Sequence, residues 1–189
     1  MCSVLIVSSS DKGRVMLSEL CKSCSLTNIA TTSDAERARD LLHKKSFDII
    51  IINSPLSDES GKELSLFIAE NYYTGVLLLV KKDNADEVSA LVQDAGVFVL
   101  HKPVNRYLFS QSIKLILAYS KRIRGLYNKT IKLETKIEET QLINRAKCVL
   151  IQYLKMTESQ AHRYIEKQAM DLRRPKRAIA ESIIKTYEY

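Results

Sequence analysis

The amino-acid sequence predicts an α/β protein that continues into helices. We expect a five-stranded, doubly wound parallel sheet, then a coiled-coil helix, then a three-helix bundle. Three observations lead to this prediction. Five short apolar runs alternate with amphipathic helical patterns over the first 120 residues. A heptad pattern follows them, and three short helical patterns fill the rest of the 189-residue chain.

The five predicted strands are short apolar runs, several of them rich in β-branched residues, at residues 4–7, 28–31, 48–52, 76–80 and 97–100. The helical patterns cover residues 11–24 and 33–43, a segment around Leu64, residues 83–95, and a last segment opened by Lys102 and Pro103. Ser33 is the predicted N-cap of the second helix. Because strands and helices alternate at short spacing, we expect every crossover to be right-handed.

The apolar spacing also predicts which helical side chains face the sheet. In the first helix they are Val15, Leu17, Leu20 and Cys21. In the last helix they are Leu108, Ser112, Leu115 and Ile116. The carboxyl ends of the strands form the edge where such sheets usually place their functional crevice. The residues predicted at this rim are Ser8, Ser9, Asn53, Val80 and Lys102.

This half of the chain resembles a response-regulator receiver domain. The resemblance rests on the run DIIIIN before Gly61, on the Ala95–Gly96 pair, and on the sequence His101-Lys102-Pro103. It implies a flavodoxin-like strand order. It also implies an acidic pair after the first strand, an acceptor aspartate after the third, a hydroxyl after the fourth, and a lysine after the fifth.

Most of these phosphotransfer residues are replaced. The first three sites hold Ser8 and Ser9, Asn53 and Val80 in this chain, and only Lys102 matches. Mg²⁺ prefers anionic oxygen ligands, and a carboxamide is not a nucleophile toward a phosphoryl group. We therefore predict a degenerate receiver that is retained for contacts. Asp58, in the loop after the third strand, is predicted to be a surface turn residue.

The net charge of +7 is unevenly distributed along the chain. Residues 1–120 hold 13 Lys and Arg against 14 Asp and Glu, whereas residues 121–189 hold 16 against 8, a net charge of +8. Such a basic segment is typical of a polyanion-binding domain, although a charged coiled-coil surface gives a similar excess. The densest positive cluster consists of Arg173, Arg174, Lys176 and Arg177.

Other features of the composition argue against several classes of protein. No apolar run is long enough to cross a bilayer, and the first residues lack the basic segment of a signal peptide. We therefore predict a cytoplasmic protein without a membrane partner. Cys21 and Cys24 form an isolated C-x-x-C pair, which we interpret as reduced thiols rather than a metal or redox site. The scattered histidines suggest no catalytic group, so we predict neither an enzyme nor a cofactor.

A heptad pattern after residue 120 predicts the seam of a coiled coil. The seam consists of Ile123, Leu126, Thr130, Leu133, Ile137 and Thr140. We predict a parallel homodimer that pairs along this seam. Packing of the helix on the body of its own chain is the alternative. Gly125 weakens the helix near its start and predicts a kink or a hinge there.

Local signals predict three short helices over residues 145–189. The first has an apolar stripe of Ala146, Val149, Leu150 and Leu154. Thr157 and Gln160 form a predicted capping box for the second, and Pro175 suits the first turn of the third. The buried faces predicted for the second and third helices are Ala161, Tyr164, Ile165, Gln168 and Ala169, then Ala178, Ile179, Ser182 and Ile183.

Residues 142–184 resemble the ANTAR domain, the RNA-binding module of bacterial transcription antiterminators. The matching stretches are RAKC, TESQA, QAMD, and RRP followed by a helix with IAES. The family's signature positions hold Ala146, Lys147, Ala161, Ala169, Met170 and Ala180 here. The resemblance implies that a dimer binds two small hairpin loops in nascent leader RNA. The predicted RNA contacts are these six residues together with Arg173, Arg174, Lys176 and Arg177.

These patterns predict three segments: a degenerate receiver over residues 1–120, a coiled-coil linker over 121–141, and an ANTAR domain over 142–189. The predicted function is RNA-binding transcription antitermination, controlled without phosphorylation. The alternative is a protein-interaction adaptor, whose receiver-like domain docks a sensor protein while the helical tail only dimerises. Only the first function predicts salt-dependent affinity for RNA.

Overall fold

The structure is a computed structural model that describes residues 2–187. Its internal contacts divide the chain into two compact units, Met1–Gly125 and Leu126–Tyr189. Each unit is described by itself. Within the described residues, no helix combines the length and the apolar character that a membrane crossing requires.

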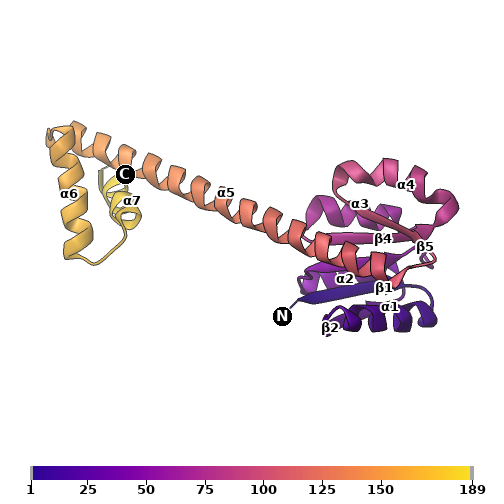
Figure 1. Ribbon diagram of the computed structural model, residues 1–189. Helices are drawn as coiled ribbons and strands as arrows, with labels where there is room; N and C mark the ends of the chain where they lie inside the picture. Colours follow the sequence, from indigo (N-terminus) through magenta and orange to yellow (C-terminus); the bar gives the residue numbers. More distant parts are fainter. Residues whose placement is uncertain (1, 188–189) are drawn as a thin grey trace. The chain divides into compact units, whose positions relative to one another are not determined.

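The first unit is built on a five-stranded parallel sheet with the strand order β2-β1-β3-β4-β5 (Figure 1). Its strands are β1 (Ser3–Ser8), β2 (Asn28–Thr32), β3 (Ile49–Asn53), β4 (Gly75–Lys81) and β5 (Phe98–Lys102). The predicted doubly wound sheet is confirmed. The four isoleucines of β3 are fully buried, alternately in the cores on the two faces of the sheet, which explains their unbroken apolar run.

Helices cover both faces of this sheet. On one face lie α1 (Asp11–Ser23) and the first turns of α5 (Arg106–Leu154). On the other lie α2 (Ala35–Lys44), α3 (Lys62–Asn71) and α4 (Ala85–Val92). The segment predicted as one helix over residues 83–95 is α4 flanked by two 3-10 turns, η1 (Lys82–Asn84) and η2 (Gln93–Ala95).

Two local predictions for the first helices are wrong. The N-cap of α2 is Asp34, whose carboxylate accepts from the Arg37 amide at 2.9 Å, while the Ser33 hydroxyl donates to Asp34. In α1, Leu17 is buried but Val15 is 60% exposed. Two residues turn an α-helix by about 200°, so these two side chains point in nearly opposite directions.

Helix α5 begins later than predicted and buries a different face. It begins at Arg106, because Lys102 still belongs to β5 and the Asn105 side chain accepts from two amides of the first turn. In the first unit its fully or nearly buried residues are Phe109, Ile113, Ile116 and Ser120. Of the predicted face, Ile116 is buried and Ser112 half-buried, whereas Leu108 and Leu115 are 45% and 63% exposed. At Gly75, an added Cβ would lie 2.2 Å from Ile116 Cγ2. Only glycine permits this close approach of α5 to β4.

The second unit contains the rest of α5 with α6 (Glu158–Asp171) and α7 (Lys176–Tyr187). Thr157 and Gln160 form the predicted capping box, which is confirmed. The buried core is Ala146, Val149, Leu150, Ala161, Ile165, Ile179, Ala180 and Ile183. Three predicted core residues, Leu154, Tyr164 and Ser182, are instead exposed. Their helices are amphipathic, but the face that packs into this core does not include these three side chains.

The heptad segment of α5 is a continuous helix through Gly125. An added Cβ at Gly125 would meet nothing within 4 Å. Along the seam, Leu126, Leu133 and Ile137 are 51%, 62% and 57% exposed. A single chain therefore leaves these large apolar side chains in contact with water.

Candidate functional site

The predicted rim residues lie together at the carboxyl end of the sheet. Ser8 at the end of β1 is paired in register with Asn53 at the end of β3. Lys102 ends β5 beside Lys81 of β4. Val80 is also on this edge, but its side chain is only 3% exposed. The rim therefore forms as expected, with an apolar side chain at the position where a receiver would have a hydroxyl.

The uncharged side chains of Ser8 and Asn53 hydrogen-bond to each other. The Asn53 Nδ2 group donates to Ser8 Oγ at 2.8 Å, and the Ser8 hydroxyl in turn donates to the Ser10 carbonyl at 3.3 Å. An added Cβ at Gly13 would lie 2.6 Å from Ser8 Oγ and 2.7 Å from Asn53 Nδ2. The first turn of α1 thus lies directly against the pair. Neither member of the pair carries a charge.

The nearby carboxylates are engaged elsewhere. Asp11 pairs with Arg14, whose guanidinium also donates to the Ser8 carbonyl at 2.5 Å. Asp58 is exposed in a bend, as expected of a surface turn residue, and it also caps α2, since its carboxylate accepts from the amides of Ala35 and Glu36 at 2.9–3.1 Å. Desolvation raises the pKa of Asp58, but these hydrogen bonds outweigh it and hold the pKa below its ordinary value.

This donor set does not fit Mg²⁺. The ion requires several anionic or carbonyl oxygens in nearly octahedral geometry. Here the Ser8 and Asn53 side chains hydrogen-bond to each other, and the Arg14 guanidinium donates to the Ser8 carbonyl beside them. Within residues 2–187, no three His, Cys, Asp or Glu side chains gather in an arrangement suited to a metal ion.

Lys102 contacts backbone rather than an acidic side chain. Its Nζ donates to the Ser54 carbonyl at 2.5 Å, which ties β5 to the loop after β3. Burial, followed by the charge of Lys81, lowers the pKa of Lys102 below its ordinary value. The lysine that matches the receiver pattern is therefore used to hold this loop.

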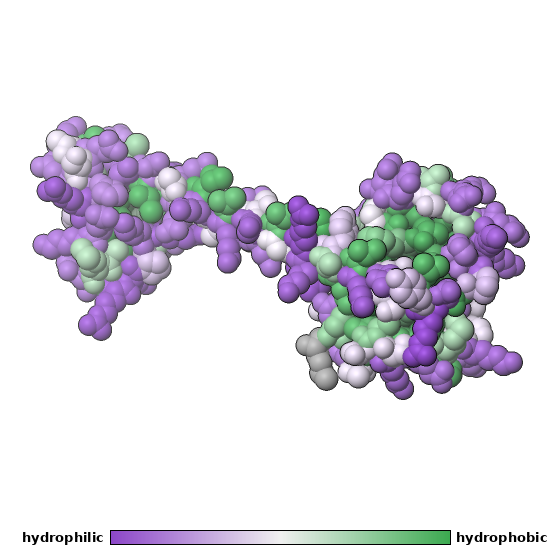
Figure 2. Space-filling view, viewed as in Figure 1, coloured by the Kyte–Doolittle hydropathy of each residue, from purple (hydrophilic) through white to green (hydrophobic). Residues whose placement is uncertain are grey.

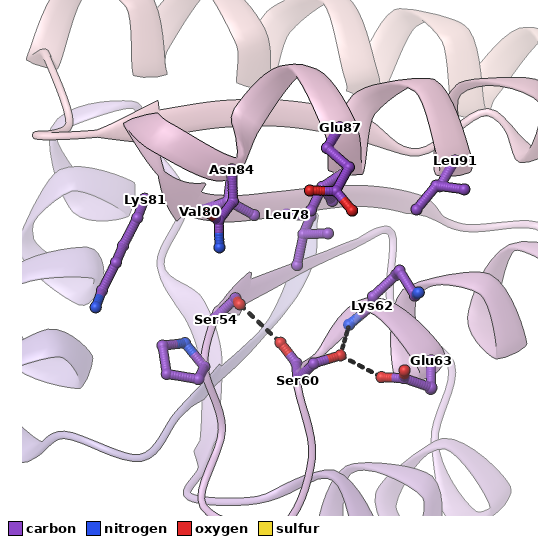
Figure 3. A pocket seen from close by; sticks show the side chains of 12 residues that line it. Ser54, Ser60, Lys62, Glu63, Leu78, Val80, Lys81, Asn84, Glu87 and Leu91 are labelled. Carbon is purple, nitrogen blue, oxygen red and sulfur yellow. Dashed lines mark hydrogen bonds between the residues drawn. The ribbon is translucent and has the colours of Figure 1, made fainter.

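A pocket of about 380 Å³ opens beside the rim, between the loop after β3 and helix α4 (Figure 3). Leu78, Val80 and Leu91 form apolar walls, and Asn84 and Glu87 reach into it from η1 and α4. The Ser54 hydroxyl donates to the Ser60 carbonyl at 2.7 Å and shapes its opposite side.

The two cysteines of the C-x-x-C pair are not joined in a disulfide. Cys21 is buried in the core beneath α1, and Cys24 is half-buried; both are free. Burial raises the pKa of the Cys21 thiol to about 12. A reactive cysteine requires a thiolate at neutral pH, and Cys21 is protonated there.

In the second unit, three of the predicted RNA-contacting alanines are structural. Ala146, Ala161 and Ala180 are fully buried and belong to the core where α5, α6 and α7 meet. Their small side chains let the helix backbones approach one another. Ala169 is half-buried against the same core. The prediction that these buried side chains meet an RNA loop is therefore wrong for this conformation.

Several predicted cationic contacts are already ion-paired. Lys147 lies 3.2 Å from Glu158, and its side chain is only 16% exposed. Lys176 lies 2.6 Å from Glu166, and Arg177 lies 3.1 Å from Glu181. The pairs of Lys176 and Arg177 neutralise two of the four cations in the cluster around residues 173–177.

The remaining cations form an exposed surface along α6. Arg173 and Arg174 follow the helix, and Met170 in its last turn is 71% exposed. Sequence reasoning missed Arg163 and Lys167, which are exposed one turn apart on α6; their i,i+4 spacing was the available signal. Within the described residues, none of these four cations has an ion-pair partner. We call Arg163, Lys167, Met170, Arg173 and Arg174 the α6 surface.

The end of α6 fixes the position of Arg173. Arg173 has a left-handed backbone conformation, with φ of +50°, and the Arg174 amide donates to the Ala169 carbonyl at 3.0 Å. A non-glycine residue with this conformation costs free energy and needs local contacts to hold it.

In Figure 2, the visible face of the second unit is mostly hydrophilic, with isolated apolar side chains between the polar ones.

Two sequence-family models match the chain. The response regulator receiver domain matches residues 4–114, and the ANTAR domain matches residues 132–184. The transcriptional regulatory protein PdtaR of Mycobacterium tuberculosis (strain ATCC 25618 / H37Rv) is 25% identical over 184 residues, covering 97% of this chain and 89% of PdtaR. The aliphatic amidase regulator of Pseudomonas aeruginosa is 24% identical over 144 residues, covering 74% of each chain.

Solved structures of similar fold cover the first unit. A response regulator receiver domain protein from Clostridium thermocellum has a TM-score of 0.59 at 17% identity, covering 65% of this chain and 99% of its own. The chemotaxis response regulator CheY4 of Vibrio cholerae has a TM-score of 0.55 at 22% identity, covering 62% and 99%. At these identities the likeness concerns the fold alone.

Proposed function

Because the chain belongs to the response regulator receiver family and carries an ANTAR domain, we propose that it regulates transcription by binding nascent RNA. Both resemblances predicted from the sequence are confirmed by the family matches. The finer proposal is antitermination: the protein binds paired hairpin loops in leader RNA and favours read-through. The α6 surface carries this proposal, because it combines four exposed cations without ion-pair partners in residues 2–187 with an exposed methionine.

The chemistry of the α6 surface suits an RNA loop. Arginine and lysine side chains meet phosphates, and these contacts set position and affinity. Sequence-specific RNA readers usually act on loops, where unstacked bases are accessible to side chains. Met170 supplies an apolar contact among the cations, and the exposed Tyr164 nearby on α6 supplies a ring for stacking.

The exposed heptad seam supports a dimer. Leu126, Leu133 and Ile137 are more than half exposed in one chain, and pairing two such seams would bury them. A dimer carries two α6 surfaces, which matches two hairpins. Bivalent binding raises apparent affinity without new contacts.

The rim supports control without phosphorylation. The acceptor position is Asn53, hydrogen-bonded to Ser8, and the donor set around it does not fit Mg²⁺. We propose that the receiver fold of this chain transmits a signal by binding a partner or a ligand. A sensor protein that docks on this domain is one such partner.

A salt titration tests the RNA-binding function. We expect the full-length protein to bind two-hairpin leader RNA with an affinity that falls steeply as salt is added. Replacing Arg173 and Arg174 with alanine should lower the slope of log K against log salt by roughly one unit per lost phosphate contact. The control is Lys185→Ala, which removes one charge from an exposed position of α7.

The same titration separates the RNA reader from the adaptor. A folded dimer that ignores hairpin RNA at low salt would favour the adaptor function. If the slope of log K against log salt is unchanged in the double variant, the α6 surface does not contact the RNA. The same conclusion follows if Lys185→Ala changes the slope equally.

Phosphorylation provides a separate prediction. Incubation with radiolabelled acetyl phosphate and Mg²⁺ should leave the wild-type protein unlabelled. The variant Asn53→Asp should also remain unlabelled, because restoring the acceptor does not restore the acidic Mg²⁺ ligands missing at Ser8 and Ser9. One stable phosphate in the first unit of the wild-type protein would contradict the degenerate receiver.

A further inference from the structure

A row of large apolar side chains lies on the outer side of α5 within the first unit. Leu108, Leu115 and Tyr119 are 45%, 63% and 44% exposed. They follow one another at spacings of seven and four residues, which places them on one face of the helix. We call these three residues the outer row of α5. Single exposed apolar side chains are common on protein surfaces, whereas a contiguous row of them marks a contact surface.

Tyr119 is held in position by its neighbours. Its ring packs edge-to-face against Phe98 of β5, with 5.8 Å between the ring centroids. An added Cβ at Gly96 would lie 3.1 Å from the Tyr119 hydroxyl oxygen. An aromatic side chain that is already ordered loses little conformational entropy when a second surface covers it, and tyrosine is enriched at the centres of interfaces for this reason. The outer row therefore includes an ordered aromatic side chain suited to a protein contact.

The outer row repeats eighteen residues further along α5. At this spacing its three residues are followed by Leu126, Leu133 and Ile137, which belong to the heptad seam. Eighteen residues make five turns at 3.6 residues per turn, and α5 is one helix from Arg106 to Leu154. The outer row and the seam therefore form one apolar stripe. Because the stripe keeps the period of a straight α-helix, pairing along it requires little supercoiling.

The seam alone is short for a stable dimer. It spans residues 123–140, whereas a coiled coil that is recognised from its sequence sustains the pattern over at least about three to four heptads. Specific protein interfaces bury roughly 1,200–2,000 Å² in total, which requires more contact than a few paired turns provide. Adding the outer row lengthens the apolar stripe to residues 108–140. A second α5 helix is the partner whose length and apolar pattern match the whole stripe.

We propose that the outer row of α5 binds the outer row of a second copy of this chain, so that the dimer interface begins at Leu108 in the first unit rather than at Ile123. This inference rests on the dimer proposed above and deepens it, because the receiver fold then contributes to pairing together with the coil. Tyr119 packs against β5, so a ligand or partner that shifts β5 also changes the strength of the dimer. The receiver fold thereby controls how firmly two α6 surfaces are held in one molecule.

Sedimentation equilibrium of the full-length protein, without RNA, tests this surface. Leu115→Asp should raise the dissociation constant of the dimer roughly tenfold or more, because pairing would bury an unpaired carboxylate. The melting temperature of the receiver fold should not change, since Leu115 is 63% exposed in one chain. Tyr107→Asp is the matched control. It adds the same charge to α5 at a side chain that is 69% exposed but points about 100° away from Leu108, and it should leave the dimer intact.

Leu115→Ala separates pairing from folding. Alanine is the best helix former and only removes apolar area, so we expect an unchanged melting temperature together with a dimer that is roughly fivefold weaker. A wild-type protein that remains monomeric at millimolar concentration would overturn the proposal. So would a Leu115→Asp variant that dimerises as strongly as the wild type, or a Tyr107→Asp variant that is weakened equally. Because no RNA is present, none of these results depends on whether the chain binds RNA.

Discussion

A variant in which Leu133 and Ile137 are both replaced by aspartate is expected to be monomeric and to bind two-hairpin RNA roughly a hundredfold more weakly than the wild type. Both side chains belong to the heptad seam and are 62% and 57% exposed in a single chain. In a paired coil they would be buried, and an unpaired carboxylate at such a position costs several kcal/mol. Loss of the dimer removes the bivalent advantage.

The control adds the same charge on the outer side of the helix. In the heptad that runs through Ile123 and Thr130, Asn128 and Thr135 occupy the position farthest from the seam. Asn128→Asp with Thr135→Asp should leave a dimer with nearly wild-type RNA affinity. Sedimentation velocity reports the mass, and a single-hairpin RNA reports intrinsic affinity. An unchanged mass in the seam variant would show that dimers form through another surface.

Ala180→Leu is expected to destabilise the second unit by about 1–3 kcal/mol and to abolish RNA binding for that reason. Ala180 has no exposed surface and lies in the core shared by α5, α6 and α7. A core of this size supplies only about 3–5 kcal/mol, so overpacking consumes a large part of its stability. Thermal denaturation of the full-length protein should show a lower transition for the second unit and an unchanged one for the receiver fold.

Ser182→Leu provides the comparison, because Ser182 lies on α7 but is exposed. It should leave both transitions nearly unchanged. If Ala180→Leu kept the wild-type melting temperature and lost only specific RNA binding, Ala180 would be a contact residue and its burial in the free chain would not describe the bound state.

Sequence patterns determined the elements with strong local signals. The isoleucine run of β3 is β-branched throughout and buried on both faces, as is typical of a central strand in a covered sheet. The capping box of Thr157 and Gln160 lies within four residues and needs no distant partner. The replacements at Ser8, Ser9 and Asn53 could be read directly, because register at the ends of parallel strands follows from the strand boundaries.

The tertiary structure alone decided which face of each helix is buried. In α5, the stripe of Leu108 and Leu115 and the stripe of Phe109, Ile113 and Ile116 both fit a helical period. Contact with β4 at Gly75, more than thirty residues earlier in the chain, selects the second stripe. Periodicity shows that an apolar face exists, but its orientation depends on the packing of distant segments.

The tertiary structure also decided which polar residues remain available to a ligand. Lys176 and Arg177 look like Arg173 and Arg174 in sequence, but within the described residues carboxylates on α6 and α7 pair with Lys176 and Arg177 and not with the two arginines before them. Asp58, in the loop after β3, caps α2, and among residues 2–187 the buried Thr32 Oγ1 has no hydrogen-bond partner. Charge and hydrogen-bonding capacity are properties of the sequence, whereas pairing depends on distances between residues far apart in the chain.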